Sequence, residues 1–350
     1  MKKTLLSITC TLLALLTALS GCSCAPTSPL VFNDAFAGET ANLSNYREEL
    51  TFDVTYKDSY ATIKKDDSIK DGALPTYSNG SCTMVLQSVT AIPSFITTDL
   101  DFNGIIWSLS TSMTIDVTFG EKTFNDQTLS KVYFHSSGHS FTPIYSDVTQ
   151  KNSYVFLTES STTVRQYLYK SVTTYRKADF TLDKYEYTGD DVTSLDVSTV
   201  AVESLVKRDD SVVKGYSPKQ AIDNAELLFA MRNIDVKLES TYSLPTISSA
   251  YGEPKTLSIR NVSETNKKVT FNYNGTDYSV DMPVKNLAFA IGGTDNTGSE
   301  QHLSVQKAKT EQFAFNNALP IEYVETLYEY GTLLKIGAFV YSLKTVSITQ

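Results

Sequence analysis

The stretch Trp107-Ser108-Leu109-Ser110-Thr111-Ser112-Met113-Thr114-Ile115-Asp116-Val117-Thr118-Phe119 decides the fold class. Successive side chains of a β-strand point to opposite faces, so this stretch presents one mainly apolar row and one polar row. It therefore predicts a long strand with one solvated face. Shorter runs rich in Thr, Tyr, Val and Phe predict further strands at residues 50–56, 132–135, 154–159, 163–174, 180–187 and 339–348.

Two local signals lie in the second half of the chain. Asn274-Gly275 separates two alternating runs and predicts a tight two-residue hairpin turn. Residues 217–232 predict a helix, because Ser217-Pro218 offers an N-cap and a first-turn proline before apolar residues at helical spacing. This helix is expected to pack on a sheet.

These patterns together predict a mainly β (α+β) protein. We expect two antiparallel β-rich domains, residues 43–208 and 209–350, with the one clear helix packed on the second. The boundary near residue 208 is placed at the charged cluster Lys207-Arg208-Asp209-Asp210. A long curved antiparallel half-barrel of the LolA/LppX type is the alternative, and it rests on an analogy of architecture.

The amino terminus carries the most specific motif. Met1-Lys2-Lys3 and the apolar run from Leu5 to Leu19 are typical of a secretory signal. Leu19-Ser20-Gly21-Cys22 resembles the lipobox of bacterial lipoproteins at all four positions. The resemblance implies that a signal peptide of residues 1–21 is removed, that Cys22 is lipidated, with palmitate as an expected acyl chain, and that residues 22–42 form a tether.

The same resemblance implies a location in the cell. Acyl chains on Cys22 would hold the mature chain to the cell membrane on its extracytoplasmic side, because two or more chains anchor stably where one is marginal. In a cell with a single membrane this is the outer leaflet, and in a cell with two membranes it is the envelope.

The charge of the chain argues against nucleic acid as a partner. The full chain has a formal net charge of −9. Loss of Lys2 and Lys3 with the signal leaves 28 basic against 39 acidic residues, a net charge of −11. Phosphate binding needs clustered Lys and Arg, and the sequence has no basic tract.

One segment resembles a metal-binding loop. Asp99, Asp101 and Asn103 alternate before Gly104, as oxygen ligands do in the first half of a calcium loop, which makes calcium the one candidate cofactor. The twelfth position, where a bidentate Glu belongs, is Ser110. A tight turn at Asn103-Gly104 is the simpler interpretation.

Other candidate groups have plain structural interpretations. His135 and His139 are spaced for zinc on a helix, but the serines and glycine between them predict exposed loop histidines. Glu322, Glu325 and Glu329 alternate with tyrosines, a mixture that suits a sugar site, yet they are expected to form the solvated edge of a strand. Cys82 is expected to be a small buried hydrophobe, with a bridge to Cys24 as the alternative.

No catalytic constellation stands out in the sequence, so we expect a lipid-anchored extracytoplasmic binding or scaffold lipoprotein of the cell envelope. Its 21 tyrosines against one tryptophan suit recognition of a glycan, a peptide or a protein. Two alternatives are kept. One is an envelope hydrolase that acts on glycan or peptide, with carboxylates brought together by the fold. The other is a lipid or lipoprotein carrier with an apolar cavity.

Overall fold

The computed structural model describes residues 35–37, 43–61, 74–102, 104–137, 140–157, 161–189, 192–216, 221–247, 254–291, 300–328 and 335–349. The chain from Val31 to Gln350 forms one compact unit. The predicted signal peptide and Cys22 lie outside the described residues. Of the predicted tether, residues 22–42, only the short 3-10 turn Ala35–Ala37 is described.

Strands dominate this unit, which confirms the prediction of a mainly β protein. The first eight strands are β1 (Arg47–Lys57), β2 (Thr76–Val89), β3 (Ile105–Phe119), β4 (Lys122–Ser137), β5 (Ser140–Leu157), β6 (Thr162–Tyr175), β7 (Asp179–Glu186) and β8 (Val206–Lys214). The remaining strands are β9 (Ile222–Asp223), β10 (Thr241–Ile247), β11 (Lys255–Tyr273), β12 (Thr276–Ile291), β13 (Gln301–Gln306), β14 (Pro320–Tyr328) and β15 (Lys335–Thr349).

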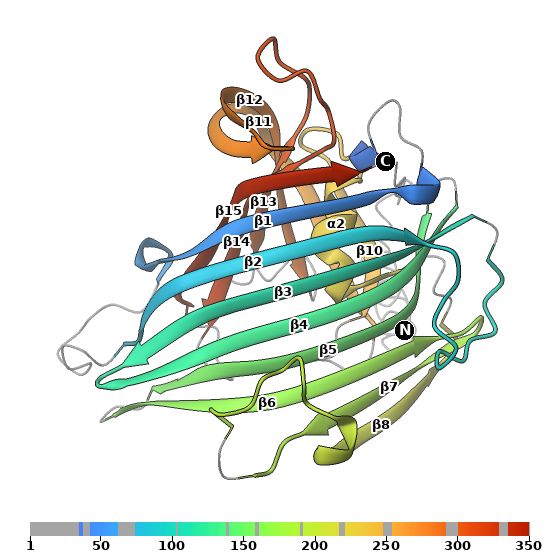
Figure 1. Ribbon diagram of the computed structural model, residues 1–350, viewed down its shortest axis with the longest axis vertical. Helices are drawn as coiled ribbons and strands as arrows, with labels where there is room; N and C mark the ends of the chain where they lie inside the picture. Colours follow the sequence, from blue (N-terminus) through green and yellow to red (C-terminus); the bar gives the residue numbers. More distant parts are fainter. Residues whose placement is uncertain are drawn as a thin grey trace, which may run out of the picture. The chain divides into compact units, whose positions relative to one another are not determined.

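All 15 strands in the described part of the chain belong to one sheet, in the order β8-β7-β6-β5-β4-β3-β2-β1-β15-β14-β13-β12-β11-β10-β9. The first half of the chain therefore builds one half of the sheet as a meander, and the second half builds the other (Figure 1). They join where β1 pairs antiparallel with β15, from Arg47 opposite Thr349 to Lys57 opposite Ala338. The predicted boundary near residue 208 falls in β8, and a division into two domains stays a prediction.

The sheet is strongly curved, as in the half-barrel alternative (Figure 1). In the second half the curvature brings β11 back to β15, where Asn272 and Tyr273 pair in parallel with Thr345 and Val346. Strands β11 to β15 consequently form a closed ring at this end. Phe313 fills the ring, with its side chain fully buried against the aromatic rings of Phe271, Tyr273, Tyr278 and Phe315.

The hairpin and the long alternating strand form as the sequence predicts. Asn274 and Gly275 have positive φ angles of 48° and 85°, which two-residue turns of this kind require, and they join β11 to β12. In β3, Trp107 and Leu109 are fully buried, and Ser112 on the other face is exposed, but Ser108 on that same face is buried, so the polar face is solvated only in part.

The helix is shorter than predicted. Helix α2 spans Leu227–Arg232 and follows a 3-10 turn at Asn224–Glu226, whereas Ile222–Asp223 is strand β9, paired in parallel with β10. Asp223 is the N-cap of the 3-10 turn and forms a capping box with Glu226. Ile222 is fully buried and takes extended backbone, so the helical pattern cannot begin before it. Residues 217–220 lie outside the described residues.

Helix α2 lies inside the curve of the sheet and contacts both halves (Figure 1). Its Phe229 packs on Phe134 and Phe141 of β4 and β5, with ring centroids 5.3 and 5.4 Å apart. Its Arg232 forms a bidentate ion pair with Glu48 of β1, at 2.7 and 2.9 Å, and both side chains are almost fully buried. Arg232 also donates to the carbonyl oxygens of Asn317 and Ala318, between β13 and β14, so the helix fastens the two halves together. Within the described ranges, no helix has the length and apolar composition that crossing a bilayer requires.

Candidate binding cavity

A cavity of about 480 Å³ lies between the two halves of the sheet and is bordered by the start of α2. This volume is within the range of cavities that hold small organic ligands, roughly 300–1,000 Å³. Its lining comes from strands β2 to β6 on one side, from β12 to β15 on the other, and from Asp223 to Leu228 between them.

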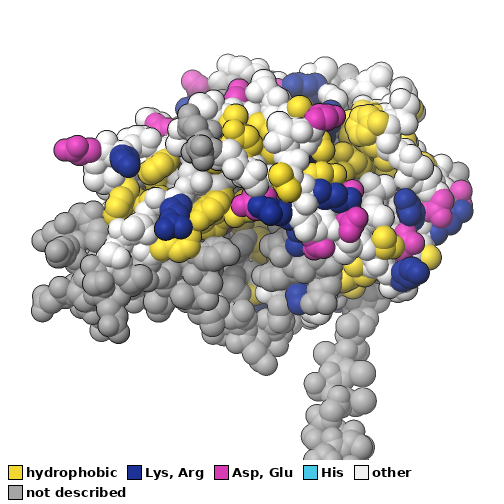
Figure 2. Space-filling model, turned by 90° about the horizontal axis from the view of Figure 1, so that it is seen from below, with side chains coloured by type: hydrophobic (Ala, Val, Ile, Leu, Met, Phe, Trp, Pro, Cys, Tyr) yellow, Lys and Arg dark blue, Asp and Glu magenta, His cyan; other side chains and the backbone are white. Residues whose placement is uncertain are grey.

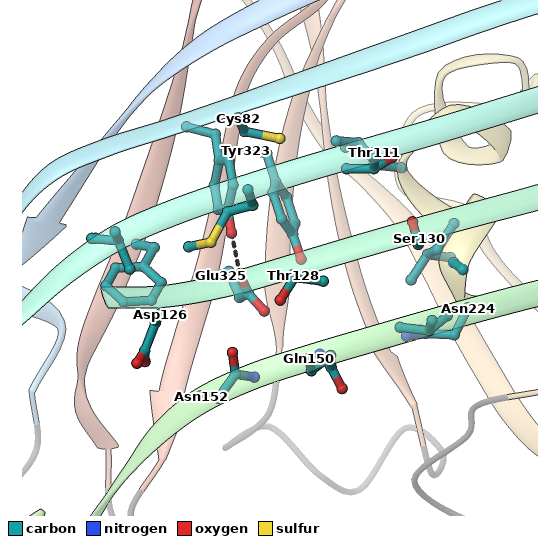
Figure 3. Close-up of a pocket in the computed structure, with 18 of the residues that line it drawn as sticks. Cys82, Thr111, Asp126, Thr128, Ser130, Gln150, Asn152, Asn224, Tyr323 and Glu325 are labelled. Atoms are coloured by element: carbon teal, nitrogen blue, oxygen red, sulfur yellow. Dashed lines mark hydrogen bonds between the residues drawn. The ribbon is translucent and has the colours of Figure 1, made fainter. Parts of the chain in front are cut away.

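The wall formed by β3 to β6 is rich in hydroxyl and amide groups. Alternate residues of each strand face inward, so every strand contributes a row of side chains (Figure 3). The polar members of these rows are Thr111 of β3, Thr128 and Ser130 of β4, Ser146, Gln150 and Asn152 of β5, and Thr173 of β6. Such a wall can hydrogen-bond to a ligand along its length.

The wall formed by β12 to β15 is rich in aromatic rings. Phe289 of β12 stacks on Tyr323 of β14, with centroids 6.2 Å apart and an interplanar angle of 4°. Tyr323 in turn lies 5.1 Å from Tyr341 of β15. Phe339 of β15 continues the wall to Tyr77 of β2, at 5.0 Å. The two sides of the cavity thus differ in chemistry.

Among the described residues that line the cavity are three carboxyl groups, and two of them accept three hydrogen bonds each. Asp126 of β4 accepts from the backbone N–H and the hydroxyl of Ser153, each at 2.7 Å, and from the amide of Gln166 at 2.9 Å. Burial raises the pKa of Asp126, and these hydrogen bonds partly oppose that shift. Asp126 is therefore committed to joining β4 with β5 and β6.

Asp223 belongs to a second buried network. Its carboxylate accepts hydrogen bonds from Ser146 at 2.5 Å, from Tyr175 at 2.6 Å and from the backbone N–H of Ala225 at 2.8 Å. Burial raises the pKa of Asp223, which these donors partly oppose, and burial together with the nearby Asp223 raises the pKa of Glu226 well above its ordinary value. This acid pair anchors the start of α2 to the first half of the sheet.

Glu325 of β14 differs from both aspartates. Its Oε2 accepts a hydrogen bond from the Tyr341 hydroxyl at 2.6 Å, the contact drawn dashed in Figure 3. Among the described residues, its Oε1 has no donor. Burial raises the pKa of Glu325, and the Tyr341 hydroxyl partly opposes the shift. The second carboxylate oxygen is therefore open to a ligand in the cavity.

No positive side chain of the described residues balances these acids inside the cavity. Among the described residues that line it there is no Lys, Arg or His. Cys82, which also lines it, is a buried free thiol whose pKa is raised to about 12 by burial and, secondarily, by Glu325. Cys82 is thus a neutral thiol on the same face of β2 as Met84, as the sequence predicts, and Cys24 lies outside the described residues.

Two of the three candidate calcium ligands, Asp99 and Asp101, contact Lys177. Asp99 accepts the backbone N–H of Lys177 at 2.8 Å, and Asp101 pairs with the Lys177 ammonium at 2.8 Å. Asn103 lies outside the described residues. The described ranges contain no cluster of three or more His, Cys, Asp or Glu that could hold a metal ion, and calcium here stays a prediction.

Asn103 lies outside the described residues, so a tight turn at Asn103-Gly104 stays a prediction, but the two residues do not form a two-residue hairpin between strands. Gly104 ends the connection of residues 90–104 between β2 and β3, which is far longer than a two-residue turn. It has a φ of +151°, and a Cβ there would lie 2.5 Å from the Ser136 carbonyl oxygen. The glycine is required by this close approach to β4.

Two other sequence interpretations need correction. His135 is buried on β4 rather than exposed in a loop, and His139 lies outside the described residues. Glu322 pairs with Lys267 of β11 on the face of β14 opposite the cavity, but Glu325 lines the cavity, and Glu329 is not described. The signal was present in the sequence, because Glu325 is two residues after Tyr323 and therefore shares its face.

The face of the molecule seen in Figure 2 has no large patch of charges of one sign, because Lys and Arg side chains lie next to Asp and Glu there. Many described surface charges are paired in this way. Examples are Lys207 with Asp183, Arg208 with Glu186 and Arg260 with Glu300. The cavity, rather than a charged patch on this face, is therefore the candidate functional site.

Comparison with known proteins does not assign the chain to a family. No family model, no curated protein and no solved structure matches it. The argument for function consequently rests on the cavity and on the motif at residues 19–22.

Proposed function

We propose that this protein is a lipid-anchored extracytoplasmic binding protein of the cell envelope, and that it holds a small ligand in the cavity between the two halves of its sheet. The observation that carries the proposal is the cavity itself, which has one hydrogen-bonding wall and one aromatic wall. Protein interiors are ordinarily packed with few voids larger than a water molecule, so a space of this size with polar walls suits a ligand.

The chemistry of the walls favours a polar ligand over an acyl chain. A lipid carrier needs an apolar surface, since each buried polar group without a partner costs free energy. Here hydroxyl and amide groups such as those of Thr128, Gln150 and Asn152 line one side. A lipid tail would leave these groups without hydrogen bonds.

A hydrolase is the second candidate, because Asp126, Asp223 and Glu325 line one cavity. Acid–base hydrolysis needs one carboxyl that is protonated and another that is ionised, set apart by their surroundings. The pKa values of all three are shifted upward, and both aspartates are occupied by structural hydrogen bonds. Binding therefore has the stronger support.

The test of ligand binding uses the full chain purified from its cells in a non-ionic detergent. Mass spectrometry of the denatured protein identifies small molecules that are carried through purification. Thr128→Trp places an indole in the cavity, and Thr123→Trp places one on the exposed part of the same strand. We expect a ligand to accompany the wild type and Thr123→Trp but not Thr128→Trp. Identical content in all three would contradict the proposal.

The anchor rests on Leu19-Ser20-Gly21-Cys22 and is tested separately. Cells fed a labelled palmitate should label the wild-type protein, and Cys22→Ala should abolish both the label and membrane fractionation. Unlabelled protein, or unchanged fractionation of Cys22→Ala, would remove the anchor from the proposal and leave the cavity argument intact.

A further inference from the structure

We propose that the cavity binds a small organic cation, whose ammonium group pairs with Oε1 of Glu325 beside the rings of Tyr323 and Tyr341. This inference rests on the proposed binding function and names the class of ligand. It follows from three properties of the cavity: an available carboxylate oxygen, an aromatic wall around it, and a lining without a positive side chain.

The first property is the geometry of Glu325. It lies on β14 and is half-buried, and one of its oxygens is held by Tyr341 while the other is reachable from the cavity. A carboxylate accepts up to about four hydrogen bonds, so Oε1 can accept from a ligand while Oε2 keeps its bond from Tyr341. A ligand that brings a positive N–H or N–CH₃ group to Oε1 gains a charge-assisted contact there.

The second property is the aromatic wall. The rings of Phe289, Tyr323 and Tyr341 form a continuous row from β12 to β15 on the side of the cavity from which Glu325 projects. The faces of aromatic rings attract cations, by about 0.5–2 kcal/mol for each well-placed ring, and ring clusters with a carboxylate suit ammonium groups. A neutral or anionic ligand would gain nothing from this combination.

The third property is charge. The described lining contains three acidic groups and no basic one, so an anionic ligand would meet only like charge. The formal net charge of −9 for the chain adds a weaker long-range attraction for cations. Thr128, Gln150 and Asn152, drawn with Glu325 around the same space in Figure 3, would receive the hydrogen-bonding groups of the cation.

The test compares ammonium compounds with neutral counterparts of the same shape. Choline is paired with 3,3-dimethylbutan-1-ol and benzylamine with benzyl alcohol, and tetramethylammonium serves as the smallest cation. Binding to the full chain in a non-ionic detergent is measured by titration calorimetry. We expect at least one ammonium compound to bind about tenfold or more tightly than its neutral counterpart. Equal affinity within both pairs, or no binding by any of the three cations, overturns the inference.

Variants then assign the preference to Glu325. Glu325→Gln keeps the shape and the acceptor for Tyr341 but removes the charge, and it should abolish the preference for the cation. Glu325→Asp should restore part of it. Glu322→Gln, on the face of the same strand opposite the cavity, should leave it unchanged. Thermal unfolding of each variant shows that it is folded. A preference that survives in folded Glu325→Gln overturns the assignment.

The pH dependence gives an independent readout. Protonated Glu325 cannot pair with an ammonium group, so the affinity for the cation should rise as the pH rises through the raised pKa of Glu325 and then level off. The titratable groups near Glu325 are Tyr323 on the same strand, Tyr341 on β15 and Cys82 on β2, whose raised pKa values keep them neutral at neutral pH and below. Asp126 and Asp223 share the cavity and also have raised pKa values, so the part of the rise that is lost in Glu325→Gln is the part that belongs to Glu325.

Failure of this inference is distinguishable from failure of the proposed function. Neutral compounds that bind as tightly as the cations, and are blocked by Thr128→Trp, would leave a binding protein with a ligand of another class. Thr128→Trp that copurifies with the same molecules as the wild type would instead remove the cavity as a binding site.

Discussion

The two walls of the cavity come from the two halves of the chain, and they treat their acidic groups differently. Asp126 in the first half is held by donors from Ser153 and Gln166, whereas Glu325 in the second half has one donor, Tyr341. A carboxylate surrounded by donors supports the fold, and one left with an open oxygen is available to a ligand. The comparison teaches that burial alone does not identify a functional acid; its hydrogen-bond partners do.

The largest expected effect is on the buried ion pair that joins the two halves. Arg232→Ala leaves Glu48 buried without its partner and removes hydrogen bonds to the carbonyl oxygens of Asn317 and Ala318. Breaking a buried pair in this way costs about 3–5 kcal/mol. We expect that loss in the free energy of unfolding, measured with urea.

The exposed pair of Arg260 and Glu300 is the control for this measurement. Arg260→Ala should cost at most about 1 kcal/mol, because exposed ion pairs contribute little. Equal losses in Arg232→Ala and Arg260→Ala would mean that the buried pair does not hold the two halves together.

The second prediction compares the two acids directly. In Asp126→Asn the new NH₂ group must face a donor, either the Ser153 backbone or the Ser153 hydroxyl and Gln166 amide, and we expect a loss of about 1–3 kcal/mol. In Glu325→Gln the carbonyl still accepts from Tyr341 and the NH₂ turns to the cavity. We expect this variant to be as stable as the wild type or up to about 1 kcal/mol more stable at pH 7. Similar losses in both variants would erase the contrast.

The third prediction concerns Glu226 at the junction of the halves. Its pKa in the folded protein is well above 4.5, so above about pH 4.5 the unfolded chain loses this proton while the folded protein keeps it. Stability is therefore lost as the pH rises from the unfolded pKa towards the folded one. Glu226→Gln should raise the unfolding free energy by about 1–3 kcal/mol at pH 8 and have little effect at pH 4.

Thermal unfolding over this pH range measures the effect of Glu226→Gln. The exposed Glu203→Gln is the control and should change stability little at any pH. An effect of Glu226→Gln that is constant with pH would show that the side chain acts through packing rather than through its proton.

The smallest effects lie in one hairpin of each half. Gly120, between β3 and β4, and Gly275, between β11 and β12, have φ angles of +61° and +85° with open space around them. Alanine at either position should cost about 1 kcal/mol, from backbone strain alone. Urea unfolding measures both, and a much larger loss at one turn would show that this turn also fixes the register of its half.

The sequence predicted correctly the features that depend on adjacent residues, and it failed for those that depend on residues far apart in the chain. Strand β3 and the turn at Asn274-Gly275 were predictable, because alternation and positive φ are properties of a few adjacent residues. The helix start was not, since buried Ile222 and the capping box of Asp223 with Glu226 replaced the stronger local signal at Ser217-Pro218. At Ile222 and Asp223, pairing with β10 outweighed the local preference for helix.

The candidate site shows the same limit. The alternation of Tyr323 and Glu325 placed both on one face of a strand, but not on the inner face, which depends on what that face packs against. Cys82 was predicted to be buried among apolar neighbours, yet it lines a cavity opposite β14, more than 200 residues along the chain. No local sequence pattern predicts that strands so far apart in the chain line the same cavity.

The sequence by itself determined the strand-rich character of this protein, its tight hairpin and a terminal motif that resembles a lipobox, because each depends on neighbours along the chain. The tertiary structure alone decided that β1 pairs with β15, that Arg232 meets Glu48 and that Glu325 turns an oxygen toward the cavity. The physical reason is that curvature and pairing across a 15-stranded sheet set which inward faces meet, and those faces make the cavity.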